Sequence, residues 1–75
     1  MIRTMRILCE AGDKVIAEWD TDTIDPDRLT EIETEFKERM AEGFFAVDIH
    51  EKRNQLIRNF DLNADILLIP RVQGG

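Results

Sequence analysis

The run Ile66-Leu67-Leu68-Ile69, near the end of this 75-residue chain, decides which fold the sequence can adopt. Four consecutive apolar residues lack the alternation of a strand with one wet face, so they indicate a central strand that is covered on both sides. Pro70 follows directly and has no backbone N–H, which ends ladder pairing on one side. We therefore expect the last strand to lie in the middle of a sheet, beside the first strand of the chain.

That first strand belongs to a predicted β-hairpin from Thr4 to Asp20. A three-residue loop, Ala11-Gly12-Asp13, would use Gly12 for positive φ. The resulting register has an apolar inner face, on which it pairs Met5 with Trp19, Ile7 with Ala17 and Cys9 with Val15. The outer face joins opposite charges twice, because it pairs Arg6 with Glu18, Leu8 with Ile16 and Glu10 with Lys14.

An amphipathic helix is predicted from Pro26 to about Glu42. Asp25 is placed to cap it, and Pro26 stands at the first helical position, where its missing N–H costs nothing. One buried stripe recurs at spacings of three and four residues and consists of Leu29, Ile32, Phe36 and Met40. The charged side has supportive i, i+4 pairs in Glu33–Lys37 and Glu35–Arg39, and Gly43 is expected just past the helix end.

The segment between this helix and the last strand predicts two further strands. Residues 44–50 alternate as a strand, with Phe45, Val47 and Ile49 on the face expected to meet the helix. Residues 55–60 form a shorter strand, with Leu56 and Phe60 predicted to point inward, and residues 61–65 read as a loop. The order β-β-α-β-(β)-β predicts a two-layer α+β domain with one helix laid across a mixed sheet.

The composition favours a small module on which other proteins act. A 75-residue chain has little room for both a core and an enclosed substrate site, so we expect no enzyme activity. The net charge of −6 repels nucleic acid phosphates and anionic lipids, so neither partner is expected. One cysteine, Cys9, and one histidine, His50, predict no metal site and no cofactor. Without a visible signal peptide or long apolar span, the expected location is cytoplasmic.

Both ends of the chain resemble ubiquitin-like proteins of the β-grasp fold. The strands around Gly12-Asp13-Lys14 look like the first hairpin of ubiquitin, in which a Gly-Lys turn joins two short strands. The ending Pro70-Arg71-Val72-Gln73-Gly74-Gly75 is similar both to ubiquitin's Arg-Leu-Arg-Gly-Gly and to the Pro-Pro-Val-x-Gly-Gly of molybdopterin-synthase small subunits. The resemblance implies a four- to five-stranded mixed sheet in residues 1–70 and a flexible tail in residues 71–75. A prokaryotic ubiquitin-like modifier fits best.

Three functions follow from this resemblance. The first is a protein modifier, in which an E1-like enzyme adenylates the carboxylate of Gly75 and the chain is conjugated to target amines. The second is a sulfur carrier with a thiocarboxylate at Gly75, and the third is a non-conjugating β-grasp interaction subunit. Paired glycines suit the first two, because glycine passes through a narrow channel and leaves the acyl carbon unhindered.

The modifier hypothesis assigns roles to particular residues. Gly74 and Gly75 are the activated segment, and the activating enzyme would recognise Arg71, Val72 and Gln73. Leu8 and Ile16, if both lie on the outer face of the hairpin, are either a partner-docking patch or ordinary surface residues. The candidate acceptor lysines are Lys14, Lys37 and Lys52. Partners would include the E1-like enzyme, target proteins and, further along the pathway, an E2-like conjugating enzyme and a metallopeptidase.

Overall fold

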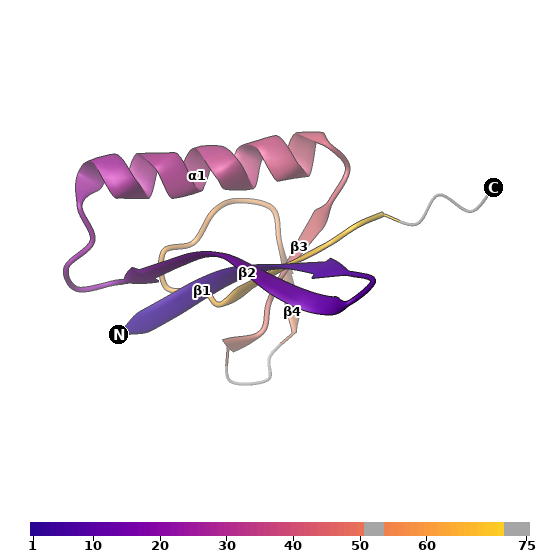
Figure 1. Ribbon diagram of the computed structural model, residues 1–75. Coiled ribbons are helices and arrows are strands. Elements are labelled where there is room, and N and C mark those ends of the chain that lie inside the picture. Colours follow the sequence, from indigo (N-terminus) through magenta and orange to yellow (C-terminus); the bar gives the residue numbers. More distant parts are fainter. Residues whose placement is uncertain (51–53, 72–75) are drawn as a thin grey trace.

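The computed structural model describes residues 1–50 and 54–71, which form one sheet with a helix across it (Figure 1). The elements in chain order are β1 (Ile2–Cys9), β2 (Gly12–Asp20), α1 (Pro26–Ala41), β3 (Phe45–Asp48), β4 (Gln55–Ile57) and β5 (Ile66–Ile69). The strands are ordered β2-β1-β5-β3-β4, with β5 parallel to β1 and antiparallel to β3. This mixed five-stranded α+β arrangement confirms the predicted fold class and is consistent with a β-grasp fold.

The central position of β5 also confirms the prediction drawn from its apolar run, but only one of its faces is covered by the helix. Ile66 and Leu68 point toward α1 and are fully buried. Leu67 and Ile69 alternate with them and are half-buried on the face away from the helix. The expectation that both faces are covered was therefore wrong.

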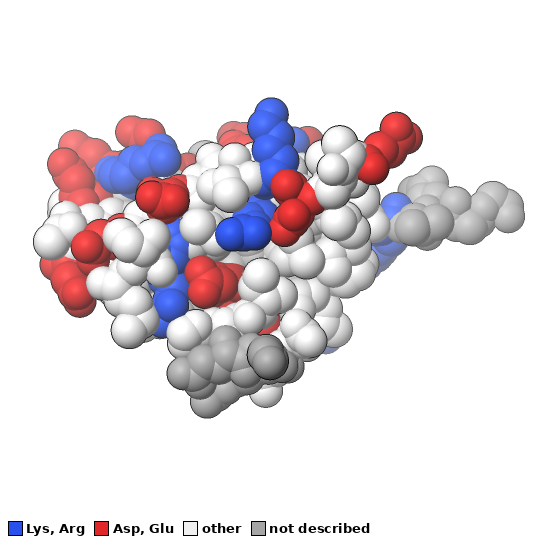
Figure 2. All heavy atoms as spheres, turned by 60° about the horizontal axis from the view of Figure 1, so that its bottom comes forward, with Lys and Arg blue, Asp and Glu red and all other residues white. Residues whose placement is uncertain are grey.

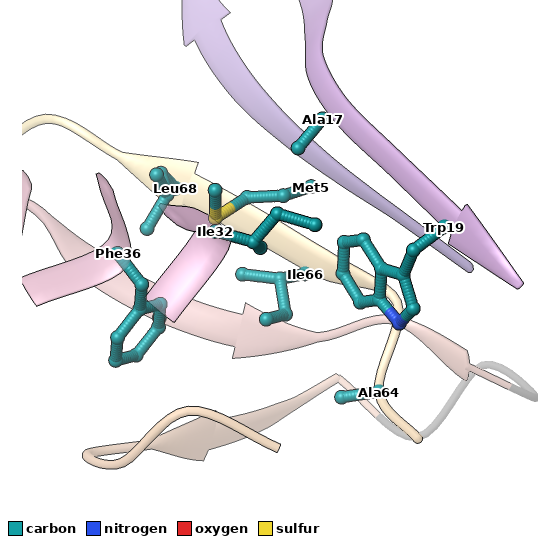
Figure 3. Packing of buried hydrophobic residues seen from close by; sticks show 9 residues of the cluster. Met5, Ala17, Trp19, Ile32, Phe36, Ala64, Ile66 and Leu68 are labelled. Atoms are coloured by element: carbon teal, nitrogen blue, oxygen red, sulfur yellow. The ribbon is translucent and has the colours of Figure 1, made fainter. Parts of the chain in front are cut away.

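The core lies between α1 and the inner face of the sheet (Figure 3). Its largest fully buried side chains are Phe36, Met5, Ile32, Ile66 and Leu68. The loop before β5 closes one side of this core: Phe60 packs against both Trp19 and Phe36, with ring centroids 5.7 and 5.8 Å apart. The Trp19 indole Nε1 donates to the Leu62 carbonyl at 2.9 Å, so the buried polar atom is satisfied.

Helix α1 begins and ends for the predicted reasons. The Asp25 carboxylate accepts from the Asp27 N–H at 2.8 Å, and Pro26 is the first helical residue. Gly43 has a φ of 104°, which a residue with a Cβ rarely adopts, and it reverses the chain toward β3. The two expected ion pairs form, with Lys37 Nζ 3.8 Å from Glu33 and Arg39 3.0 Å from Glu35.

The hairpin forms with a different register from the predicted one. Its loop has two residues, Glu10 and Ala11, and Gly12 supplies the positive φ of 114° as the first residue of β2. Met5 lies opposite Ala17, whereas Arg6 lies opposite Val15. Ile16 is therefore an extra residue in β2, and this bulge reverses the inward and outward faces beyond it. The alternation read from the sequence could not reveal that reversal.

The inward residues of β3 and β4 also differ from those predicted, although Phe60, beyond the end of β4, packs against the core as expected. Ala46 is the buried residue of β3, and it lies opposite Ile57, which packs against the core. Val47 and Leu56 lie opposite each other on the face away from the helix, and Leu56 is 71% exposed. The flanking apolar residues hid this arrangement, because both faces of each strand carry apolar side chains.

Replacing Phe36 with Ala should lower the free energy of unfolding by about 3–5 kcal/mol, because the cavity opens in a small core. Lys37→Ala, one position along on the exposed side, should change it by less than about 0.5 kcal/mol. Urea unfolding followed by Trp19 fluorescence measures both. A loss below about 1 kcal/mol for Phe36→Ala would contradict the described packing.

Candidate functional site

Four segments meet at one end of the sheet, which we call the Ile69 end. β5 finishes there, and because β1 runs parallel to β5, the hairpin loop lies at the same end. β3 runs antiparallel to β5 and begins there at Phe45, directly after the turn that follows α1. The hairpin loop, the end of α1, Pro70 and Arg71 thus lie at the same end of the sheet (Figure 1).

The face of the sheet away from α1 is largely apolar, and we call it the open face. A row of residues crosses all five strands on this face: Val15, Arg6, Leu67, Val47 and Leu56 are successive cross-strand partners. Phe45 and Ile69 lie opposite each other two positions further toward the Ile69 end, on the same face. Apart from Arg6, these side chains are apolar and partly exposed, so the open face has the character of an interaction surface.

The predicted docking pair, Leu8 and Ile16, is not a pair on this face. Leu8 is 40% exposed and lies opposite Asp13, whereas Ile16 is half-buried and packs against the core. The bulge puts Val15, which is 47% exposed, on the open face in place of Ile16. Leu8 is therefore exposed as predicted, whereas Val15 and not Ile16 is exposed on β2.

The other predicted site residues divide between described and undescribed parts of the chain. Arg71 is exposed at the Ile69 end. Lys14 is exposed in the hairpin opposite Ile7, and Lys37 is exposed on α1. The remaining candidates lie outside the described residues: Lys52, Val72, Gln73, Gly74 and Gly75.

The opposite end of the sheet holds a buried cation that the sequence analysis did not single out. Arg3 is 8% exposed; its Nε donates to the Asn63 carbonyl at 2.9 Å, and its guanidinium lies 3.6 Å from the Asp65 carboxylate. The Asp65 carboxylate also accepts from the Thr4 N–H at 3.1 Å, and the His50 ring lies 3.2 Å from Arg3. These contacts fasten the loop before β5 to β1, which is a structural role.

The amine of Met1 also lies at that end, and it bonds two carboxylates. It donates to Asp20 and to Asp22 at 2.9 Å in each case. The hydrogen bond to Asp20 has the larger effect, and together with the bond to Asp22 it raises the pKa of the amine above its ordinary value. The bond between the amine and Asp20 also lowers the pKa of the Asp20 carboxyl. Acidic side chains gather at this end of the molecule, on the left in Figure 2.

The described residues supply neither a metal site nor a membrane span. Within residues 1–50 and 54–71, no three His, Cys, Asp or Glu side chains are grouped closely enough to hold a metal ion. Helix α1, the helix of this part of the chain, is too short and too polar to cross a bilayer.

Comparison of the chain with protein-family models, with curated proteins and with solved structures found no match.

Sequence reasoning missed most of the open face, but one signal for it was present. The apolar run in β5 does not alternate, so it places apolar side chains on both faces of the sheet. The predicted helix can cover only one of these faces. Leu67 and Ile69 therefore had to lie on a face with no second layer. That conflict between a two-sided strand and a two-layer fold predicts an apolar outer surface.

The bulge can be tested by two neighbouring substitutions. Ile16→Ala should lower the free energy of unfolding by about 1–2 kcal/mol, because a partly buried side chain loses core contacts. Val15→Ala should change it by less than about 0.5 kcal/mol, since Val15 faces water. Chemical denaturation of both variants measures the difference. The reverse order of effects would support the three-residue loop instead.

Proposed function

We propose that this domain is a ubiquitin-like protein modifier, whose Gly75 carboxylate is activated by an E1-like adenylating enzyme and then joined to target amines. The observation that carries the proposal is the close succession of β5, the strand at the centre of the sheet, and the diglycine segment. Gly75 must be the terminal residue of the active form, whether or not a further segment has first to be removed.

The position of β5 supports a role in presenting the chain beyond it. β5 is hydrogen-bonded on both sides, and Ile66 and Leu68 anchor it in the core. The chain therefore leaves the domain from a strand that is paired on both sides and anchored in the core, at the Ile69 end, with Pro70 and Arg71 exposed. A partner that binds the sheet would therefore lie close to Arg71, the point from which the chain continues toward Gly75.

The chemistry needs little more from this chain. A carboxylate is a poor electrophile, so the activating enzyme must supply ATP and the site in which the acyl-adenylate forms and is protected from water. This chain contributes the reacting carboxylate and a surface by which it is held. The absence of a side chain at Gly75 leaves the acyl carbon open to a thiolate, a sulfide or an amine.

The open face is the proposed docking surface, and it replaces the pair Leu8 and Ile16. It combines apolar groups with Arg6, whose guanidinium is held 3.2 Å from Asp13. Partly exposed apolar groups are favourable to bury in an interface, and a flanking charge pair gives orientation. The apolar part of this surface lies on β3, β4 and β5 and consists of Val47, Leu56 and Leu67.

The covalent step can be tested in an extract of the source cells supplied with ATP. An N-terminally tagged chain that ends at Gly75 should form reductant-resistant adducts, whereas Gly75→Ala and the deletion of Gly74-Gly75 should not. Trypsin cleaves after Arg71, so each modified lysine should carry the branched remnant Val72-Gln73-Gly74-Gly75, which mass spectrometry identifies. The thermal midpoints of all three proteins should agree within about 2 °C, since ladder pairing ends at Ile69.

Other outcomes separate the alternative functions. Exchange of one terminal oxygen of Gly75 for sulfur, with no lysine remnant, would identify the sulfur carrier instead. Adducts that the Gly75→Ala chain forms equally well would show that the carboxylate is not the reacting group. If ATP produces neither lysine adducts nor a thiocarboxylate at Gly75, both activation hypotheses are overturned, and the non-conjugating β-grasp interaction subunit remains.

The docking surface can be tested by Leu56→Asp, which places a charge on the open face. The side chain is 71% exposed, so the free energy of unfolding should change by less than about 0.5 kcal/mol. Adduct formation in the same extract should fall about tenfold or more, because the charge must be desolvated on docking. Thr30→Asp, on the exposed side of α1, is the matched control and should have no effect on adduct yield. Equal yields from both variants would exclude the open face.

A further inference from the structure

A groove of about 580 Å³ opens at the Ile69 end, between the end of α1 and the ends of β4 and β5. Its apolar lining comes from Met40, Phe44, Phe45, Leu56 and Ile57. The groove thus runs from the helix end to β4, which is an edge strand of the sheet. Its volume is within the range of ordinary ligand pockets, about 300–1,000 Å³, and apolar walls of this kind favour an apolar side chain.

Two arginines, Arg58 and Arg71, complete the lining of this groove. Six arginines belong to the described part of the chain, and four of these are ion-paired within 4 Å: Arg3, Arg6, Arg28 and Arg39. Neither Arg58 nor Arg71 has a carboxylate partner among residues 1–50 and 54–71. The two arginines without an internal partner therefore line the same groove.

This distribution is unusual for an acidic chain. The protein has 16 acidic against 10 basic residues, yet no described Asp or Glu lines the groove. Helix α1 ends beside it, and the unpaired carbonyls of a helix C-terminus also favour nearby cations over anions. The groove is thus a positive site on a molecule with a net charge of −6.

The combination of charge and apolar walls selects the chemistry of the ligand. A phosphate or other small anion would use the arginines and leave the apolar lining unfilled, whereas an apolar ligand would leave two guanidiniums without a partner. A peptide with carboxylates beside an apolar side chain satisfies both parts. An extended peptide also matches the neighbouring edge strand β4, because sheet edges can pair with an added strand.

We propose that this groove binds an extended, acidic peptide segment of a partner protein, with one apolar side chain in the groove and carboxylates on Arg58 and Arg71. Arginine suits this role because its planar guanidinium can bind a carboxylate with two hydrogen bonds. The segment would hold its partner next to the chain that follows Arg71. The proposal does not depend on activation of Gly75, since it concerns binding alone.

The test begins with a phage-displayed library of random heptapeptides, selected on the immobilised wild-type chain. Most of the selected peptides should fail to bind an Arg58→Ala, Arg71→Ala double variant, and they should place Asp or Glu next to an apolar residue. Both arginines are exposed, so the double variant should keep the wild-type thermal midpoint. Failure to enrich any peptide over the double variant, or enrichment of peptides without acidic residues, would overturn the proposal.

Nuclear magnetic resonance titration of the enriched peptide then locates the site. Backbone amides of Gly43, Phe45, Ile57 and Arg71 should shift in a saturable manner. Each single arginine variant should weaken binding about tenfold, as expected for the loss of a charge-assisted hydrogen bond. Arg28→Ala, at the other end of α1, should leave it unchanged.

Two matched probes test whether both parts of the groove are used. Replacing the acidic residues of the peptide by amides, or its apolar residue by serine, should each weaken binding about tenfold or more. Inorganic phosphate should produce no saturable shift at these amides below the millimolar range. Saturation by phosphate as tight as that by the peptide would show an anion site instead. Shifts confined to Arg6, Val15 and Val47, which lie on the open face outside the groove, would place the peptide elsewhere.

Discussion

The pairing of β5 between β1 and β3 is the constraint on which the rest of the structure depends. A parallel partner on one side and an antiparallel partner on the other fix β5 in the centre of the sheet. Ile66 and Leu68 then face Ile32 and Phe36 across the core, and their burial stabilises the helix against the sheet. The same pairing determines which segments meet at the Ile69 end. Because β1 is parallel to β5, it ends there, and because β3 is antiparallel to β5, it begins there.

One helix covers one face, and this has consequences for the surface. The apolar residues of β5 that face away from α1 can be shielded only by their neighbours, so Leu67 and Val47 form a continuous apolar strip with Leu56. The bulge at Ile16 also turns Val15 outward, and Arg6 lies between Val15 and this strip. Charge is also distributed unevenly: carboxylates surround Met1 at one end, while Arg58 and Arg71 line a groove at the other.

The sequence predicted those features that local chemistry determines. Asp25, Pro26 and Gly43 define the ends of α1 through capping and backbone freedom, and the structure confirms each of them. The apolar run from Ile66 to Ile69 predicted a central strand, which the structure confirms, although the helix covers only one of its faces. The inward faces of β3 and β4 were wrong because apolar residues occupy both faces, and the hairpin register was wrong because a bulge leaves no mark on the alternation. The groove joins residues distant in sequence, and Arg58 has no local signature of a site.

Native-state hydrogen exchange, followed residue by residue, tests the central position of β5 most directly. Amides in the middle of a sheet that is packed against a helix open only on global unfolding. The amides of Leu67 and Leu68 should therefore exchange with the free energy of global unfolding measured by urea, whereas those of Gln55–Ile57, in the edge strand β4, should exchange faster. Exchange of Leu67 and Leu68 as fast as that of Leu56 would contradict a β5 held between β1 and β3.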